Sequence, residues 1–439
     1  MNRIPLTAGI FATALALALT GCASFGEGVG RAVLSHVEGD PEVDTRACEI
    51  QGAPFDGILV ALQAQDGQGQ IGHAPTSERT VVKLMIVHGV GSHHPGYSGR
   101  TVANLTGELG LDVVSPQIKS VDLLDPNVPG ESIGTLTAQR FTDDAGEREL
   151  VVYELTWSRI SDRARANLRF DGSQIHTRHR APLNQLGKTF VNDVLVDPLV
   201  YVGVGRDKIL SAVRQGMCWA YSTDWDGFPE APVPCRQGDP QYGSRLPMDR
   251  FFFVTHSLGS RIVLDALETS AEGIYARMDS GADTSLFLAN LRDHTVTVFM
   301  LANQLPLLQA GFAPVPVTGQ IADYCMPDGP LYQRRIVTRT RVIAFSDPND
   351  LLSYPIPDDF VQYGIDSRLC PTVVNMSLNI ARVSRVLARD GFANPLTAHT
   401  GYNDDTRVIG LMTGGLGREA TAPTVTERCH WVRVEESLR

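Results

Sequence analysis

The sequence predicts an α/β fold in which a mostly parallel central sheet is flanked by helices. Three observations lead to this prediction. Short apolar runs recur along the 439-residue chain with helical patterns between them, the order expected of a parallel sheet covered by helices. The run 81–87 is apolar except for Lys83, as is typical of a strand buried on both faces. The chain is 43% hydrophobic and 20% charged, a composition of folded domains and not of disordered segments.

The first half of the chain supplies four expected strands and one helix. The strands are expected at 55–62, 81–87, 134–142 and 148–157, and the helix at 98–110. The last two strands are separated by Asp-Asp-Ala-Gly, which favours a tight turn. We therefore expect these two strands to pair as neighbours.

Residues 159–245 interrupt this alternation and are expected to form a helical insertion. Six arginines gather at 159–180. We expect most of them on a solvated helix face, with contact to anionic lipid head groups or to an acidic substrate as the alternative. Apolar residues recur at helical spacing over 183–194, and Pro198 is expected to end that helix. A second helix is expected around 209–217.

The second half supplies the remaining strands of the sheet. They are expected at 250–255, 294–302, 336–345 and 372–376. Directly after the first of these, Leu258, Ile262 and Ala266 recur at helical spacing, so a helix is expected to follow that strand closely.

The charge of the chain excludes one large class of partner. The sequence has 38 basic and 49 acidic side chains, a formal net charge of −11. Proteins that bind nucleic acid carry a basic footprint, so we expect no nucleic-acid partner. No stretch has 18 or more uninterrupted apolar residues, so a multi-span membrane protein is not expected.

The first residues have the pattern of an export signal. A basic start at Arg3 and an apolar run lead to Leu19-Thr-Gly-Cys22, and such a start is typical of secretory signals. The ending resembles the lipobox of bacterial lipoproteins, which implies cleavage before Cys22 and lipidation of that cysteine. Ala23 follows, and not the aspartate that retains such proteins at the inner membrane, so the resemblance implies anchoring in the outer membrane. An ordinary signal with an incidental cysteine is the alternative.

These features divide the chain into three parts. We expect a signal peptide at 1–21, a lipidated tether that leads into the fold at 22–54, and one domain at 55–439 containing the insertion 159–245.

Six cysteines remain after Cys22, an even number in an oxidising compartment, which predicts up to three disulfides. Six cysteines allow 15 connectivities. Cys218–Cys235 is the simplest pair to predict because a short proline-rich loop separates them. Buried thiols are the alternative for some of them. The paired Cys-x-x-Cys spacing of zinc sites does not occur, so no metal is expected.

A serine stands where a nucleophile would be exposed by a sharp turn. The sequence Thr255-His-Ser257-Leu-Gly259 joins an apolar strand to a helical pattern, the context of a nucleophile elbow. Residues two before and two after the serine must be small, because strand and helix approach closely there. Gly259 meets this requirement, while Thr255 departs from the usual glycine. The alternative is a serine that only caps the helix.

A second motif follows the strand 81–87. His88-Gly89-Val90 comes directly after it, and a tight loop here would present backbone N–H groups. Acyl transfer requires such preorganised donors for the negative oxygen of its tetrahedral intermediate. Glycine-rich turns also end many ordinary strands, which is the alternative.

With these two motifs the chain resembles the α/β-hydrolase superfamily of esterases and lipases over most of 80–415. The resemblance implies an α/β-hydrolase fold with residues 159–245 as its helical cap. It implies Ser257 as nucleophile, followed along the chain by an acid and then a histidine. It also implies oxyanion donors at the N–H groups of Leu258 and Val90, with no cofactor.

The expected acid lies beyond the strand 336–345, in Ser-Asp347-Pro-Asn-Asp350-Leu-Leu. A carboxylate there would hold the histidine in its productive tautomer. Asp350 fits the family's pattern of strand, loop, acid and apolar pair, and Asp347 is the alternative, placed to cap the turn.

The expected base is His399, in a loop after the last strand. An imidazole is needed because it must accept the serine proton and later donate it near neutral pH. His430 is the alternative, although it lies beyond several glycines close to the end. His256 beside the serine is a common occupant of that motif position and is not expected to be the base.

The sequence therefore predicts an exported, lipid-anchored serine hydrolase acting on a small-molecule or lipid ester. Two alternatives stay open. One is an acyltransferase with the same triad, in which an alcohol replaces water. The other is a non-catalytic envelope lipoprotein on a degenerate hydrolase fold.

Overall fold

Residues 46–66, 68, 79–114, 117–239, 242–384 and 391–434 are described by the computed structural model. The expected signal peptide, Cys22 and most of the expected tether lie outside these residues. No helix in the described ranges is both long enough and apolar enough to cross a membrane.

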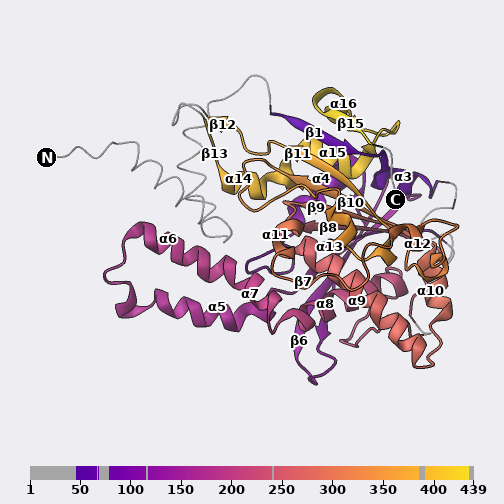
Figure 1. The fold of residues 1–439 in the computed structure, drawn as a ribbon, viewed down its shortest axis with the longest axis horizontal. Coiled ribbons are helices and arrows are strands. Elements are labelled where there is room, and N and C mark those ends of the chain that lie inside the picture. The colour runs from indigo at the N-terminus through magenta and orange to yellow at the C-terminus, as the bar shows by residue number, and fades with distance from the viewer. Residues whose placement is uncertain are drawn as a thin grey trace.

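One large sheet runs through the middle of the structure, with helices packed around it (Figure 1). Its strands are β1 (Cys48–Gly52), β3 (Val82–Val87), β4 (Asp112–Val113), β5 (Lys119–Leu124), β6 (Ser132–Thr142), β7 (Glu149–Thr156), β8 (Arg250–His256), β9 (Thr295–Leu301), β10 (Arg339–Ser346), β11 (Pro371–Leu378) and β15 (His430–Arg433). The spatial order is β15-β1-β11-β10-β9-β8-β3-β7-β6-β4, and β5 also pairs with β6. From β7 to β11 all neighbours are parallel, so the predicted mostly parallel sheet is confirmed.

Helices cover the two faces of this sheet and the ends of its strands. They are α3 (Ile58–Gln63), α4 (Gly99–Leu109), α5 (Asp162–Arg169), α6 (Pro182–Phe190), α7 (Val196–Val202), α8 (Arg206–Ser222), α9 (Gly259–Asp279), α10 (Ser285–Arg292), α11 (Leu305–Gln309), α12 (Ile321–Cys325), α13 (Phe360–Gly364), α14 (Pro395–Thr400), α15 (Thr406–Gly414) and α16 (Pro423–Arg428). Two small sheets pair β2 (Phe55–Asp56) with β14 (Gly415–Leu416), and β12 (Val383–Ser384) with β13 (Phe392–Ala393).

The sheet separates two apolar cores, because successive side chains of a strand point to opposite faces. In β3, Leu84 and Ile86 belong to the core that α4 and α15 cover. Met85 and Val87 belong to the other core, with α8 and α9. This explains why the run 81–87 is apolar at nearly every position.

The parallel arrangement places the candidate motifs at one edge. The loops after β3, β8 and β10 all leave from the carboxyl ends of neighbouring parallel strands. Ligand sites in α/β sheets lie at this edge, so the topology brings together segments that are far apart in sequence.

The expected strand 55–62 is wrong for most of its length. Only Phe55–Asp56 is extended, and Ile58–Gln63 is helical. Gly57 lies between them, where an added Cβ would be 2.3 Å from the carbonyl oxygen of Thr413. The close approach of two chain segments therefore requires glycine where the short strand ends and the helix begins, which the apolar pattern does not reveal. The main sheet instead takes β1, from the segment expected to be the tether, as a strand antiparallel to β11.

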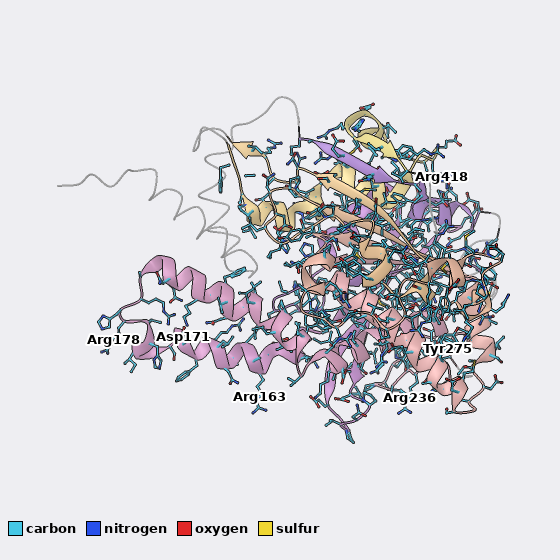
Figure 2. The ribbon with its side chains drawn as sticks, viewed as in Figure 1. Arg163, Asp171, Arg178, Arg236, Tyr275 and Arg418 are labelled. Atoms are coloured by element: carbon cyan, nitrogen blue, oxygen red, sulfur yellow. A yellow bond between two sulfur atoms is a disulfide. The ribbon has the colours of Figure 1, made fainter. Side chains whose placement is uncertain are left out.

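The insertion 159–245 divides into two different parts. Residues 158–205, here called the arm, form a helical hairpin that projects from the body (Figure 1). On the arm the exposed Arg163 and Arg178 point to solvent, as expected (Figure 2). By contrast α8 is a core helix that packs against α9 and the sheet, so it is no part of a cap.

Pro198 does not end the arm's second helix as expected. The chain passes from α6 through a π-helical turn, Val191–Leu195, into α7, which contains Pro198. Proline lacks an N–H and its ring clashes with the carbonyl four residues earlier in a regular helix. A wider turn directly before the proline relieves this clash, so the helix continues.

Three disulfides link the six cysteines. They are Cys48–Cys429, Cys218–Cys235 and Cys325–Cys370. The predicted Cys218–Cys235 pair is confirmed, and it joins α8 to the loop that leads towards β8.

Candidate active site

Ser257 occupies a sharp turn between β8 and α9. Its φ is +54°, a left-handed conformation that is uncommon for residues other than glycine and marks functional sites when surrounding structure enforces it. The Ser257 N–H donates to the carbonyl of Leu301 on the neighbouring strand at 2.9 Å. The strand–turn–helix context predicted for this serine is therefore present.

Two glycines allow the chain to approach this turn closely. An added Cβ at Gly259 would lie 2.7 Å from the carbonyl oxygen of Val87, which is closer than real Cβ contacts. An added Cβ at Gly89 would lie 2.7 Å from the Cβ of Ser257. Glycine is thus required at both positions, and the loop after β3 is held directly against Ser257.

Thr255, the departure from the family pattern, fits its position without difficulty. Its side chain is fully buried and its hydroxyl donates to the carbonyl of Phe299 at 3.3 Å. A threonine is accommodated here because the neighbouring strand supplies an acceptor.

Asp350 and His399 form a buried hydrogen-bonded pair. Nδ1 of His399 donates to Oδ2 of Asp350 at 2.8 Å, with side chains 5% and 1% exposed. Burial by itself would raise the pKa of Asp350, but the hydrogen bond from His399 and that from the N–H of Leu352 outweigh it, and the pKa is lowered. With the carboxylate ionised and Nδ1 protonated, Nε2 of His399 is left as an acceptor.

The alternative acid and base take other positions. Asp347 accepts hydrogen bonds from the N–H groups of Asn349, Ile380 and Ala381, so it ties the turn after β10 to the segment after β11. Burial raises its pKa. His430 is exposed on β15 and pairs with Glu49. The structure brings neither of them to Ser257.

His256 connects the histidine to the serine. Its Nε2 donates to the carbonyl oxygen of His399 at 2.9 Å, and the two rings meet edge to face with centroids 5.2 Å apart. Burial, with the nearby His399 second, lowers the pKa of His256 to about 3. It is therefore neutral at physiological pH and holds His399 next to the turn of Ser257.

The serine hydroxyl and the imidazole do not yet touch in this structure. Oγ of Ser257 and Nε2 of His399 are both buried, and neither has a hydrogen-bond partner among the described residues. Catalytic hydrogen bonds are often long without substrate. A cavity of about 350 Å³ adjoins this region, and His399 and the residues on either side of the contact with Ser257, Gly89 and His256, help to line it.

Two backbone N–H groups close to Ser257 in the fold have no partner among the described residues. The N–H groups of Leu258 and Val90 donate to no other residue in the described part of the chain. N–H groups without a partner are the kind of donor that can stabilise a negative oxygen.

His88 is a fixed structural group of this loop. Its Nδ1 donates to the carbonyl of Gly89 at 2.8 Å and its Nε2 accepts from the N–H of Trp157 at 3.1 Å. The ring also stacks on the Trp157 indole. Burial sets the pKa of His88 well below its usual value, so it stays neutral and braces the loop after β3.

A buried ion pair in the arm holds Gly91, the residue that follows Val90 in the loop after β3. Oδ2 of Asp197 accepts from the N–H of Gly91 at 2.6 Å, and its Oδ1 accepts from Arg165 at 2.7 Å. Both side chains are at most 1% exposed. The sequence did not single out Arg165 or Asp197. Arg165 belongs to the arginine-rich segment expected on a solvated helix face. What distinguishes it from the other arginines is its place at the start of the arm, toward the core.

No protein-family model, no curated protein and no solved structure matches this chain. Within the described ranges, no group of three or more His, Cys, Asp or Glu residues is arranged to hold a metal ion.

Proposed function

We propose that the protein is an exported, lipid-anchored serine hydrolase with an α/β-hydrolase fold, cleaving a carboxylic ester or a related acyl bond. The observation that carries this proposal is the juxtaposition of a strained, buried Ser257 with the Asp350–His399 pair. The Leu19-Thr-Gly-Cys22 sequence supports export and anchoring through Cys22 to the outer membrane.

In the proposed mechanism the Ser257 hydroxyl attacks the acyl carbonyl while Nε2 of His399 takes its proton. Asp350 keeps the imidazole oriented and stabilises its charged form. The N–H groups of Leu258 and Val90 stabilise the negative oxygen. His399 then gives the proton to the departing alcohol, and an acyl-enzyme remains.

In the second half of the reaction, His399 takes a proton from water, whose oxygen attacks the acyl carbonyl, and gives that proton to Oγ of Ser257 as the acyl–serine bond breaks and the acid leaves. Every proton that leaves one group is thus returned by the same imidazole. Oxygen and nitrogen groups of the chain suffice for each step, so the proposal requires no cofactor.

Hydrolysis of p-nitrophenyl esters of increasing acyl length tests this proposal. We expect turnover by the purified protein and a loss of at least 10³-fold in Ser257→Ala, because removal of a catalytic nucleophile leaves only residual catalysis. The exposed Ser280→Ala at the end of α9 is the matched control and should keep full activity.

Adding alcohols to the same assay separates hydrolysis from acyl transfer. Water as acceptor gives the free acid whatever alcohol is present, whereas an acyltransferase gives mainly the new ester. No turnover of any ester by folded protein would contradict the proposed function.

A further inference from the structure

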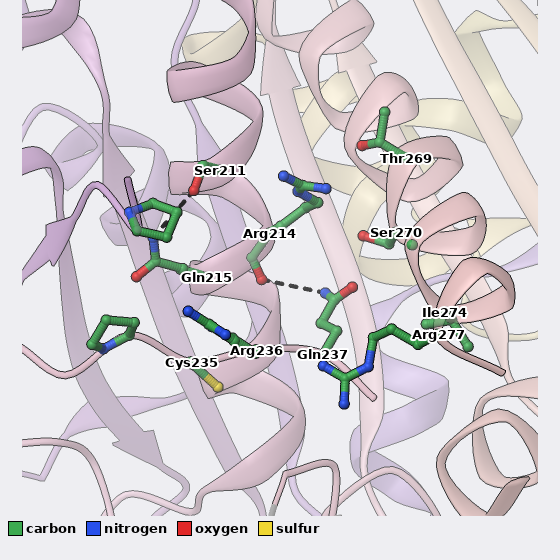
Figure 3. A pocket seen from close by; sticks show the side chains of 13 residues that line it. Ser211, Arg214, Gln215, Cys235, Arg236, Gln237, Thr269, Ser270, Ile274 and Arg277 are labelled. Atoms are coloured by element: carbon green, nitrogen blue, oxygen red, sulfur yellow. Dashed lines mark hydrogen bonds between the residues drawn. The ribbon is translucent and has the colours of Figure 1, made fainter. Parts of the chain in front are cut away.

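A second cavity lies between α8 and α9, and it shares no lining residue with the cavity beside Ser257. It has a volume of about 210 Å³. Thirteen residues line it, and three of them are the arginines Arg214, Arg236 and Arg277, while none is acidic. The three side chains come from α8, from the loop after it and from α9 (Figure 3). Such a concentration of positive charge is unusual in a chain of net charge −11.

Two of these guanidinium groups have no carboxylate partner in the described part of the chain. Arg214 is half-buried and Arg236 is exposed, and neither takes part in an ion pair there. Burial lowers the pKa of Arg214, the charge of Asp207 opposes this in part, and the neighbouring Arg206 adds to the lowering. Removing a cation from water without a partner is unfavourable, so an anion in the cavity would stabilise Arg214.

Arg277 is satisfied only in part. It pairs with Asp239 at 2.5 Å, yet its Nε is buried with no partner among the described residues. Among the described residues, the three guanidinium groups thus have one carboxylate in an ion pair, Asp239, which pairs with Arg277. An anion of charge −1 or −2 would balance the remaining charge.

Neighbouring groups hold the cavity open and fix its lining. The Cys218–Cys235 disulfide ties the loop that carries Arg236 to α8. The side-chain amide of Gln237 donates to the carbonyl of Arg214 at 3.3 Å. Ser211 accepts from Gln215 at 3.3 Å, which leaves its own hydrogen free to donate. The site is therefore built by a covalent link and side-chain hydrogen bonds.

We propose that this cavity binds a phosphate group. Arginine is the side chain best suited to phosphate, because its planar fork donates two parallel hydrogen bonds. The volume is below the roughly 300–1,000 Å³ of pockets for drug-sized ligands, which favours a small phosphomonoester or a phospholipid head group over a larger anion. The site is independent of the proposed hydrolase function.

Gly273 offers a variant that tests the site without endangering the fold. It lies in α9 and lines the cavity, and a Cβ added to it meets no atom within 4 Å. Gly273→Glu would place a carboxylate opposite the arginines, and replacing a helical glycine favours the helix. Gly273→Ala fills little space, adds no charge and is the matched control.

Calorimetric titration with inorganic phosphate at low ionic strength is the first measurement. We expect saturable binding by wild type and Gly273→Ala, at least tenfold weaker binding in Arg214→Gln, and none in Gly273→Glu. Arg163→Gln, which removes an exposed arginine of the arm, should bind as wild type does. Equal binding by wild type and Gly273→Glu, or no saturable binding by wild type, would overturn the proposal.

Two further probes identify the source of the phosphate. Glycerol 1-phosphate represents a soluble phosphomonoester, and phosphatidylglycerol vesicles, compared with phosphatidylcholine vesicles, represent a membrane. If Gly273→Glu weakens the binding of glycerol 1-phosphate alone, the ligand is soluble. If it also weakens binding to phosphatidylglycerol vesicles, the site takes a lipid head group. If Gly273→Glu weakens the binding of neither probe, the proposal is contradicted.

Discussion

Asp350 and Asp347 lie three residues apart at the end of β10 and hold different partners. Asp350 accepts from His399 beside the candidate nucleophile, whereas Asp347 accepts three backbone N–H groups from the loops around it. Asp350 is therefore expected to affect reactivity, and Asp347 to affect the stability of the fold.

Substitution of each aspartate by asparagine should separate the two roles. Asp350→Asn is expected to lower kcat by about 10⁴-fold with little loss of stability, because an amide favours the wrong tautomer of the histidine. Asp347→Asn is expected to lower the free energy of unfolding by about 1–3 kcal/mol and to leave kcat within about tenfold. Steady-state kinetics and urea denaturation of both variants check this, and an equal loss of kcat in both would refute the assignment of the acid.

Glu268 on α9 gives a pH-dependent prediction. Burial first, and the charges of Asp265 and Asp366 second, raise the pKa of Glu268 to about 7. The folded state therefore binds this proton more tightly than the unfolded state. The stabilisation that the protonated carboxyl gives the fold is complete below about pH 4.5 and is lost as pH rises through 7.

Glu268→Gln removes that dependence. The variant should have a higher Tm than wild type at pH 8, where the wild-type carboxylate is ionised and unfavourably placed. The difference should shrink to nothing at pH 4. Thermal unfolding at both pH values measures it, and a constant difference would show that the titration of this carboxyl is not its cause.

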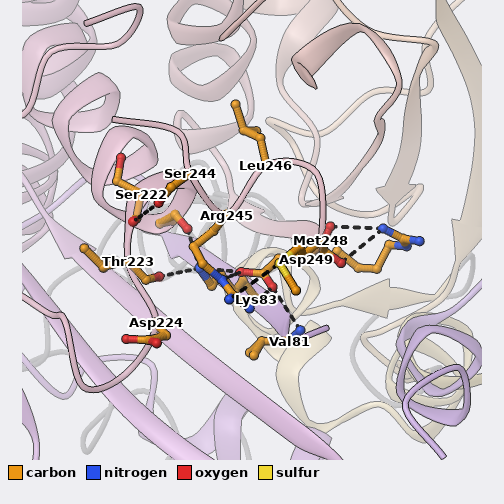
Figure 4. Close-up of polar contacts among 12 residues, drawn as sticks. Val81, Lys83, Ser222, Thr223, Asp224, Ser244, Arg245, Leu246, Met248 and Asp249 are labelled. Carbon is orange, nitrogen blue, oxygen red and sulfur yellow. Dashed lines mark hydrogen bonds and ion pairs between the residues drawn. The ribbon is translucent and has the colours of Figure 1, made fainter. Parts of the chain in front are cut away.

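At the residue scale, the sequence predicts groups that stand in recognisable local patterns. Ser257 follows a strand and precedes a helix, and Asp350 and His399 each follow a later strand, so order and spacing mark them as candidates. Lys83 is an example of a side chain whose partner the local sequence pattern does not predict. Its amine is buried within the apolar run and pairs with Asp249 at 2.7 Å, while Arg245 pairs with the same carboxylate (Figure 4). Burial lowers the pKa of Lys83, and nothing near it in sequence reveals a partner 166 residues away.

The arm is the element whose role the sequence left least defined. Its helical content follows from apolar spacing, but the continuation through Pro198 depends on a π turn that spacing does not encode. Its attachment to the site depends on the Arg165–Asp197 pair, in which the carboxylate holds the N–H of Gly91 beside Val90. We infer that the base of the arm positions one of the two candidate oxyanion donors.

Asp197→Asn tests this role of the arm. We expect kcat to fall about 10–100-fold with KM changed by less than about threefold, because a displaced donor weakens transition-state binding more than substrate binding. Stability should fall by up to about 3 kcal/mol, since the buried Arg165 loses its buried carboxylate partner and keeps only the exposed Asp162, so kinetics must be measured well below the variant's Tm. Asp171→Asn, whose carboxylate lies nearer the surface of the arm, is the control. An unchanged kcat in Asp197→Asn would show that the pair is structural only.

At the scale of the whole molecule, the two ends of the described chain meet in the sheet. β1 pairs with β15 and with β11, and Cys48 is joined to Cys429 across 381 residues. The sequence predicted the parallel centre of the sheet, because each of those strands is an apolar run next to a helical pattern. It did not predict β1 or β15, because their pairing depends on segments separated by almost the full chain.

The long disulfide should contribute more stability than the short one. In the chain-entropy account, closing a loop of 381 residues stabilises by about 6 kcal/mol, and closing one of 17 residues by about 3 kcal/mol. We therefore expect Cys48→Ser with Cys429→Ser to lose more unfolding free energy than Cys218→Ser with Cys235→Ser. Urea denaturation of the two double variants compares them, and the reverse order would show that local strain or residual structure outweighs loop length.

Reaction with a fluorophosphonate probe tests the central claim most directly, because such probes label serines only when a neighbouring base activates them. We predict that the folded protein takes up one probe per chain, that peptide mapping places it on Ser257, that Ser257→Ala takes up none, and that His399→Ala reacts far more slowly. Absence of labelling in well-folded wild-type protein, or labelling that persists in Ser257→Ala, would contradict the proposed hydrolase mechanism.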